Sequence, residues 1–171
     1  HLEKGEAFDT PQAILSYSGT GLTKLSQQYH EIIREHICRG AYKHAKRPIL
    51  INNWEATYFD FNEEKILKIA EQAQKLGIEM LVLDDGWFGK REDDNSGLGD
   101  WFVNEKKMNG SMAQLAEKIH RMGMKFGLWF EPEMISEDSD LYRAHPDWAF
   151  AIPGRVPNHS RNQLVLDMTR E

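Results

Sequence analysis

Hydrophobic residues recur along the chain at two different spacings, which predict helices and strands in turn. A spacing of three or four residues predicts helices at 22–37, 63–76 and 111–122. The middle helix has matching end signals. Asn62 can accept a hydrogen bond at its first turn, and Gly77 can adopt the left-handed conformation that often follows a helix.

Short apolar runs predict strands between and around these helices. They cover residues 12–18, 49–54, 78–86, 125–130 and 164–168. The run at 78–86 is almost continuously apolar, which is typical of a strand buried on both faces. From residue 49 onward the strands alternate with helices. This order predicts right-handed βαβ units and a parallel sheet.

The residues that follow the strands distinguish between two parallel architectures. The first strand-to-helix turn has no Gly-x-Gly-x-x-Gly phosphate loop, which argues against a dinucleotide-binding open sheet. Polar and aromatic residues instead gather where strands end, as they do in (β/α)8 TIM barrels. We therefore predict an α/β fold in which residues 48–171 form the first half of such a barrel, with about four strands. Residues 1–47 are expected to form a separate linker region with its own helix.

Composition excludes several functional classes. The formal net charge of −6 argues against sequence-independent binding of nucleic acid or of an acidic membrane surface. Cys38 is the single cysteine, so neither a disulfide framework nor a thiolate metal cluster is expected. No apolar stretch approaches the roughly 20 residues of a membrane span. Both ends resemble interior points of a longer chain, so we expect a piece of a larger protein, located in the cytoplasm.

Two adjacent acids end the second predicted barrel strand. Asp84 and Asp85 precede Gly86, which gives the chain the freedom to turn both carboxylates toward the barrel mouth. Together they offer up to about eight acceptor lone pairs in a small volume. Such a pair suits neighbouring sugar hydroxyls or a divalent cation. Sequence neighbours are poorly placed as the nucleophile and acid of a glycosidase, and an ordinary solvated turn is the alternative.

Aromatic and charged residues stand at the other strand ends. Trp54 and Trp129 can stack on the C–H face of a sugar ring, with core filling as the alternative. Glu131 and Glu133 share one face and are predicted to be structural or to support another group. Arg161 could be a fixed cation at the barrel mouth or a loop ion pair.

Other polar stretches are predicted to have no direct role in a site. Residues 90–94 have the sequence KREDD and are expected to form a solvated charged loop. His120 is expected on the surface of its helix. His145 and Trp148 are expected to pack a long loop.

Several multi-residue motifs occur together in a specific order: RPILINNWEATYFDF, VLDDGWFG, LGDW, KFGLWFEPEM, SDLYRAHPDW, PGR and SRNQLVLD. In order and spacing they resemble the start of the catalytic barrel of bacterial α-galactosidases (melibiases) of glycoside hydrolase family 36. The opening GEAFDTPQAILSYSGTGL resembles the segment that joins an N-terminal β-sandwich to that barrel. The resemblance covers essentially the whole chain.

The resemblance implies hydrolysis of terminal α-galactosyl residues, as in melibiose and raffinose, with retention of configuration and without a cofactor or metal. It also implies substrate-binding roles for several residues: Asp84 and Asp85 on the galactose hydroxyls, Trp54 and Trp129 lining the galactose subsite, and Arg161 as a further polar contact. Many relatives are tetramers. The family's nucleophile, an aspartate in a Lys-Trp-Asp motif, and its acid/base aspartate have no counterpart here. Asp167 is not a substitute, so we assign no catalytic residue and expect the isolated fragment to be inactive.

Other functions fit the same residues. A galactosyltransferase of the raffinose-synthase kind is a close variant. A metal-dependent barrel enzyme would use Asp84, Asp85, Glu131 and Glu133 as oxygen ligands for Mg²⁺ or Mn²⁺. Activity that survives EDTA treatment would exclude this alternative. A non-catalytic sugar-binding module suits the missing nucleophile, and it would bind galactose in calorimetry.

Overall fold

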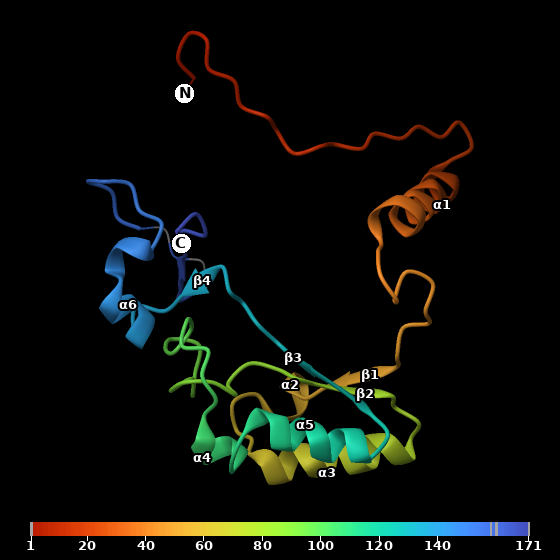
Figure 1. Cartoon of the computed structure of the whole chain (residues 1–171), viewed down its shortest axis with the longest axis vertical. Helices are drawn as coiled ribbons and strands as arrows, with labels where there is room; N and C mark the ends of the chain where they lie inside the picture. Colours follow the sequence, from red (N-terminus) through yellow and green to blue (C-terminus); the bar gives the residue numbers. More distant parts are fainter. Residues whose placement is uncertain (1, 158, 160, 171) are drawn as a thin grey trace. The chain divides into compact units, whose positions relative to one another are not determined.

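The structure, a computed structural model, describes residues 2–157, 159 and 161–170. The chain forms two compact units, residues 1–47 and residues 48–171. In the first unit an α-helix, α1 (Leu22–Ile32), continues directly into a π-helical turn, η1 (Ile33–Ile37) (Figure 1). This confirms the helix predicted at 22–37.

The strand predicted at residues 12–18 is wrong. The segment has no regular secondary structure, and its Leu15 and Tyr17 side chains are 92% and 85% exposed. A strand needs a hydrogen-bonded neighbour, and the described part of this unit offers none. Short alternation of apolar and polar residues therefore does not produce a strand here.

The second unit is built on a parallel sheet of three strands. Strands β1 (Leu50–Asn52), β2 (Met80–Leu83) and β3 (Lys125–Leu128) lie in that order. Both pairs are parallel, with Ile51 opposite Leu81 and Leu81 opposite Phe126. The α/β class and the parallel sheet predicted from the alternation of elements are confirmed.

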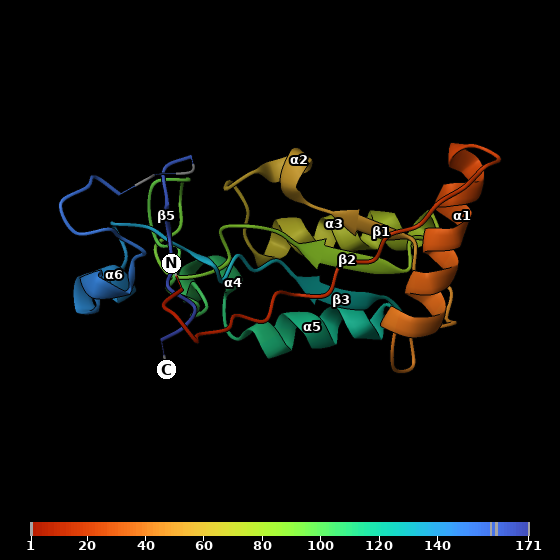
Figure 2. The same cartoon turned by 90° about the horizontal axis from the view of Figure 1, so that it is seen from above.

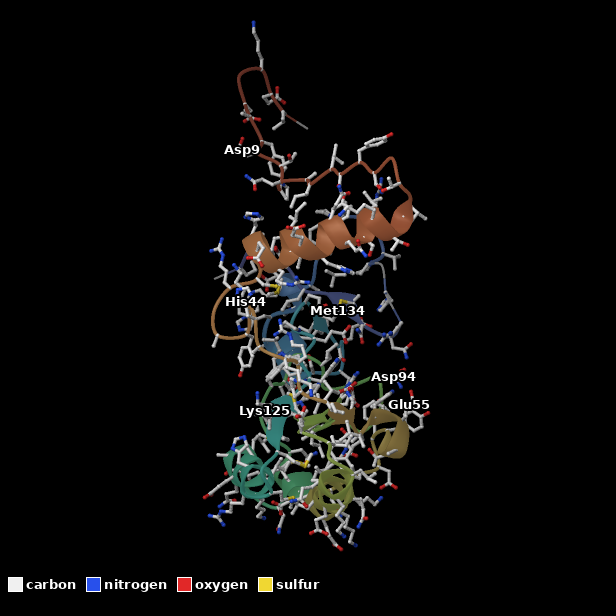
Figure 3. The ribbon with its side chains drawn as sticks, turned by 90° about the vertical axis from the view of Figure 1, so that its right-hand side faces the viewer. Asp9, His44, Glu55, Asp94, Lys125 and Met134 are labelled. Atoms are coloured by element: carbon white, nitrogen blue, oxygen red, sulfur yellow. The ribbon has the colours of Figure 1, made fainter. Side chains whose placement is uncertain are left out.

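Two amphipathic helices cover one face of this sheet. They are α3 (Glu63–Lys75) and α5 (Met112–Arg121), which lie side by side in Figures 1 and 2. Asn62 accepts a hydrogen bond from the Lys65 backbone N–H, as predicted, and begins α3. Ser111 and Gln114 form a reciprocal capping box at the start of α5. Figure 3, in which Lys125 marks the start of β3, shows both helices on the same side of the strands.

The hydrophobic core lies between the sheet and these helices. Leu81 and Leu83 of β2 are fully buried against Ile66 of α3 and Leu115 of α5. The opposite face of β2, which carries Met80 and Val82, is only half-buried. The prediction that this strand is buried on both faces is therefore wrong for the described residues. Both covering helices lie on the other side of the sheet (Figure 1).

The strand predicted at residues 164–168 does not join the parallel sheet. A two-residue strand, β5 (Leu164–Val165), pairs antiparallel with β4 (Met134–Ile135). The expectation of about four parallel strands is thus wrong, since three are present among the described residues. Sequence pattern marks an apolar run as a strand but does not say which partner it pairs with.

Short helices fill the connections of the second unit. They are α2 (Trp54–Thr57), α4 (Glu105–Met108), α6 (Asp140–Ala144) and the 3₁₀ turn η2 (Pro146–Trp148). Buried Asp100 accepts hydrogen bonds from the Asp140 and Leu141 backbone N–H groups, and so ties the loop after β2 to α6. No described helix is both long and apolar enough to span a membrane.

Candidate functional site

The carboxyl ends of β1, β2 and β3 meet at a pocket of about 350 Å³. All five residues predicted to bind substrate line this pocket, together with three neighbours. The lining residues are Trp54, Asp84, Asp85, Trp129, Phe130, Glu131, Glu133 and Arg161. They come from segments up to 107 positions apart in the sequence (54 to 161), and parallel strands bring them to one edge.

Asp84 is held in place by the end of the neighbouring strand. The Asn52 side-chain amide donates a hydrogen bond to the Asp84 carboxylate. Buried Asn53 accepts a hydrogen bond from the Asp84 backbone N–H at 2.8 Å. The Asp85 backbone N–H donates to Asp84 Oδ1 at 2.7 Å. These contacts fix the direction of the Asp84 carboxylate while leaving it at the pocket wall.

Asp85 has a different environment, because it is paired with a buried arginine. The Arg91 Nε atom lies 3.0 Å from Oδ1 and 3.2 Å from Oδ2 of Asp85, and Arg91 Nη2 lies 2.8 Å from Oδ2. Only 7% of Asp85 and 2% of Arg91 is exposed. The prediction that residues 90–94 form a wholly solvated loop is therefore wrong at Arg91. A buried carboxylate requires such a partner, and the chain supplies it six residues later.

The turn that follows Asp85 is packed tightly against neighbouring residues. Gly86 has φ +96°, and an added Cβ would lie 2.9 Å from a Phe59 ring atom. Lys107 is also buried, and its ammonium donates to the Gly86 carbonyl at 3.2 Å and to the Phe59 carbonyl at 2.9 Å. The Lys107 Nζ atom also lies 3.1 Å from Glu92 Oε2 and 4.8 Å from the centroid of the Phe61 ring. The Asp-Asp-Gly turn is thus a packed structure and not a loose loop.

Aromatic residues form the apolar walls of the pocket. Trp54 packs edge-on against Tyr58 and Phe59, with ring centroids 5.3 and 5.0 Å away. On the other side, Trp129 and Phe130 belong to an aromatic cluster with Trp87 and Trp101. The Trp87 indole N–H donates to the Trp129 carbonyl at 3.0 Å. Trp54 and Trp129 are half-buried, so each packs on one side and keeps ring surface at the pocket.

The remaining charged residues of the pocket lining are Glu131, Glu133 and Arg161. Buried Gln163 donates to Glu131 Oε1 at 2.9 Å, while Glu131 Oε2 is buried without a hydrogen-bond partner among the described residues. Glu133 and Arg161 are exposed. Arg161 has φ +56°, a left-handed conformation that is uncommon for a residue with a side chain. The pocket lining therefore includes three acids besides the paired Asp85, namely Asp84, Glu131 and Glu133, and the cation Arg161.

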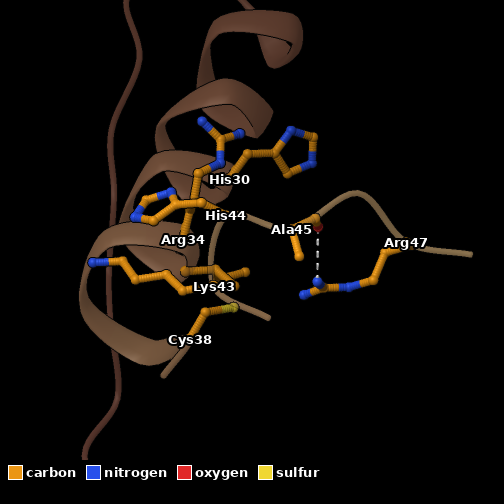
Figure 4. Close-up of a pocket in the computed structure, with 8 residues that line it drawn as sticks. His30, Arg34, Cys38, Lys43, His44, Ala45 and Arg47 are labelled. Atoms are coloured by element: carbon orange, nitrogen blue, oxygen red, sulfur yellow. Dashed lines mark hydrogen bonds between the residues drawn. The ribbon is translucent and has the colours of Figure 1, made fainter. Parts of the chain in front are cut away.

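We also considered a metal site and a second hollow as candidate functional sites. Within the described residues, no group of three or more His, Cys, Asp or Glu side chains is placed to hold a metal ion. The first unit has a basic hollow of about 440 Å³ that includes Arg34, Lys43, His44 and Arg47 (Figure 4). Two of its cations have internal partners, because Lys43 pairs with Glu35 at 3.3 Å and Arg47 donates to backbone carbonyls.

Sequence reasoning missed the residues that support the pocket. These are Asn52, Arg91, Lys107 and Gln163, together with Phe130, which lines it directly. Arg91 and Lys107 lie in charged, exposed-looking stretches, and no periodicity marks them as buried. Asn52 carried a usable signal, since two asparagines at the end of an apolar strand have polar groups that need partners.

The chain thus combines an α/β fold with two adjacent carboxylates and two indoles at the carboxyl ends of its parallel strands. The model of the Melibiase family matches residues 7–171. The chain therefore belongs to the melibiase family, as its motifs indicated.

Known relatives agree with this assignment. The chain is 62% identical over 170 residues to the bifunctional alpha-galactosidase/sucrose kinase AgaSK of Mediterraneibacter gnavus, covering 99% of this chain and 18% of that protein. It is 56% identical to alpha-galactosidase AgaA of Geobacillus stearothermophilus, covering 99% and 23%. The chain thus spans about a fifth of the length of these relatives.

Solved structures show the same local fold. The galactosidase domain of AgaSK superimposes with a TM-score of 0.85 at 63% identity, covering 91% of this chain and 22% of that one. A variant of Geobacillus stearothermophilus AgaA in complex with raffinose gives a TM-score of 0.86 at 57% identity, covering 91% and 22%.

Proposed function

We propose that this chain supplies the galactose-binding part of an α-galactosidase whose catalytic residues lie in other segments of the full-length protein. The second unit contributes the first strands of a (β/α)8 barrel. The half-exposed face of β2 becomes part of the barrel interior once further strands close the sheet. Residues 1–47 connect this barrel to a preceding β-sandwich domain.

The convergence of Trp54, Asp84, Asp85, Trp129 and Arg161 on one pocket carries the proposal. A hexose presents several hydroxyls on its edges and apolar C–H faces. Carboxylates accept from the hydroxyls, and indoles pack on the C–H face and exclude water. Asp84 and Asp85 are rigid acceptors because Asn52 and Arg91 fix them. Rigid acceptors can discriminate an axial from an equatorial hydroxyl, which is how galactose differs from glucose.

We infer that Asp84 and Asp85 bind substrate and do not take part in bond cleavage. Asp85 is neutralised by Arg91, and Asp84 is its sequence neighbour, so the two do not flank a scissile bond. A retaining mechanism requires two carboxyl groups on opposite sides of that bond, roughly 5 Å apart. The nucleophile and the acid/base group therefore come from elsewhere in the full-length enzyme. The fragment alone is inactive.

Raffinose-type oligosaccharides are the proposed substrates, in agreement with the raffinose complex of the Geobacillus stearothermophilus relative. The enzyme acts with retention, in the cytoplasm, and as a tetramer. The test is an assay of the full-length protein on p-nitrophenyl α-galactoside and on raffinose, with NMR observation of the first anomer released. Turnover that yields α-galactose first is expected. Absence of turnover on both substrates contradicts the proposal, and transfer to an added sugar in preference to water identifies a galactosyltransferase.

A further inference from the structure

Arg91 lies behind the pocket and does not line it, yet it contacts the most deeply buried acid that does. The guanidinium makes three N–H contacts with the Asp85 carboxylate, between 2.8 and 3.2 Å. Its other terminal nitrogen donates to the Ser96 carbonyl at 2.9 Å, and its carbon lies 5.6 Å from the centroid of the Phe59 ring. Arg91 is therefore held by contacts with Asp85, Ser96 and Phe59 that need no ligand.

This pairing determines what Asp85 can still do. An ionised carboxylate has about four acceptor positions, two on each oxygen. Arg91 uses positions on both oxygens of Asp85 from one side, in the planar fork geometry that guanidinium groups favour. Asp85 also lines the pocket, so we expect its remaining acceptor positions to be available to a ligand there. Because Arg91 holds the carboxylate, these acceptors would have a fixed spacing and direction.

We propose that Arg91 is a positioning residue of the galactoside site: it holds the buried Asp85 carboxylate in one orientation, so that its two oxygens accept from two ligand hydroxyls. The inference rests on the proposed function and deepens it. Arg91 touches neither the sugar nor the reacting bond.

The geometry excludes a simple exchange of one cation for another. A lysine at position 91 would supply a point charge without the two-pronged fork. It would keep Asp85 neutralised while leaving its carboxylate free to rotate. Arg91→Lys therefore keeps the positive charge but loses the fork that orients the Asp85 carboxylate, whereas Arg91→Met loses both. Arg121→Lys is a matched control, because Arg121 forms an exposed pair with Glu117 on the surface of α5.

The experiment measures kcat and KM of the full-length variants on p-nitrophenyl α-galactoside, and competitive inhibition by galactose, at a temperature where circular dichroism shows each variant folded. We expect Arg91→Met to raise KM and the galactose inhibition constant by about tenfold or more, which corresponds to about 1.4 kcal/mol of lost binding. Arg91→Lys is expected to recover part of this loss. Arg121→Lys should match the wild type.

A coupling measurement guards against a purely structural effect. In an Asp85→Asn background, Arg91→Lys should add little to the loss of galactose binding, because its target carboxylate is gone. Folded Arg91 variants with a lowered melting temperature but wild-type KM and galactose inhibition would overturn the inference. Additive losses in the double variant would overturn it as well. If the wild-type protein does not hydrolyse α-galactosides, the proposed function fails instead, and the two failures are thereby distinguished.

Discussion

The side-chain amide of Asn52, at the end of β1, donates a hydrogen bond to the carboxylate of Asp84, at the end of β2. The amide oxygen of the same residue accepts from the Trp54 backbone N–H at 2.7 Å. One side chain therefore couples the position of the acid to the start of the helical turn that carries an indole of the pocket.

Asn52→Ala is expected to weaken α-galactoside binding without abolishing turnover. The change removes the hydrogen bond that orients Asp84, which contributes about 1 kcal/mol, so KM should rise by about fivefold in the full-length enzyme. Asn104→Ala is a control, because Asn104 caps the short helix α4 and does not line the pocket. Unchanged KM in the Asn52→Ala variant would show that Asp84 needs no such support.

Trp54→Phe is expected to lower kcat/KM for α-galactosides by about tenfold. The smaller ring covers less of a sugar face, and the edge-on contacts of Trp54 with Tyr58 and Phe59 are partly lost. Trp148→Phe is the matched control, since Trp148 stacks on His145 at a centroid distance of 4.0 Å and does not line the pocket. Equal losses in the two variants would indicate a general effect on folding and not a sugar contact.

The sequence predicted the sheet and the pocket better than it predicted their surroundings. The elements at 49–54, 63–76, 78–86, 111–122 and 125–130 have strong periodicity and clear end signals such as Asn62, and each corresponds to an observed element. Placement at parallel strand ends was enough to bring Trp54 and Asp84 together. Failures occurred where pairing partners decide the structure: residues 12–18 have none, and residues 164–168 pair with β4.

Charged residues were the second kind of failure. Arg91 and Lys107 were unrecognisable as buried because their burial depends on partners that only the folded chain provides. Arg91 is buried because Asp85 needs a counter-charge. Lys107 is buried because the carbonyls of Phe59 and Gly86 need a donor. Composition alone places such residues in solvent, since lysine and arginine are rarely fully buried without a partner.

Gly127→Ala is expected to destabilise the fold by about 1 kcal/mol, the low end of the usual cost of overpacking, because the nearest atom is the mobile end of the Met80 side chain. Gly127 lies opposite Val82 in the sheet, and an added Cβ would lie 2.7 Å from Met80 Cε and 3.3 Å from Val82 Cγ2. Thermal unfolding of the full-length protein measures the effect. Adding Met80→Ala should make the double variant more stable than the sum of the single losses predicts. Strict additivity would argue against this contact.

The Asp167→Asn variant tests how stability depends on pH and whether Asp167 is a catalytic group. The Thr169 hydroxyl, followed by the Thr169 backbone N–H, lowers the pKa of Asp167 below 3.8, with a smaller contribution from Arg170. A lowered folded-state pKa stabilises the fold at pH values above 3.8, and this stabilisation is lost as the pH falls through the folded-state pKa. The variant should therefore melt at a lower temperature than the wild type near neutral pH, and the difference should shrink as the pH falls below 3.8.

The same variant should keep kcat close to that of the wild type, because Asp167 does not line the pocket. Loss of several orders of magnitude in kcat would instead identify Asp167 as a catalytic group. A melting-temperature difference that grows on acidification would contradict the direction of the pKa shift.

Removal of divalent cations is expected to leave activity unchanged. A metal site at this pocket would need the oxygens of Asp84, Asp85, Glu131 and Glu133, but Asp85 already binds the cationic Arg91 through both oxygens, and Gln163 holds Glu131 Oε1. A cation that bound Asp85 would lie close to the Arg91 guanidinium, which would repel it. The measurement is α-galactoside turnover by the full-length enzyme after prolonged dialysis against EDTA, with residual metal quantified by mass spectrometry. Loss of turnover that Mg²⁺ or Mn²⁺ restores would establish a metal-dependent enzyme and would require Asp85 to leave Arg91.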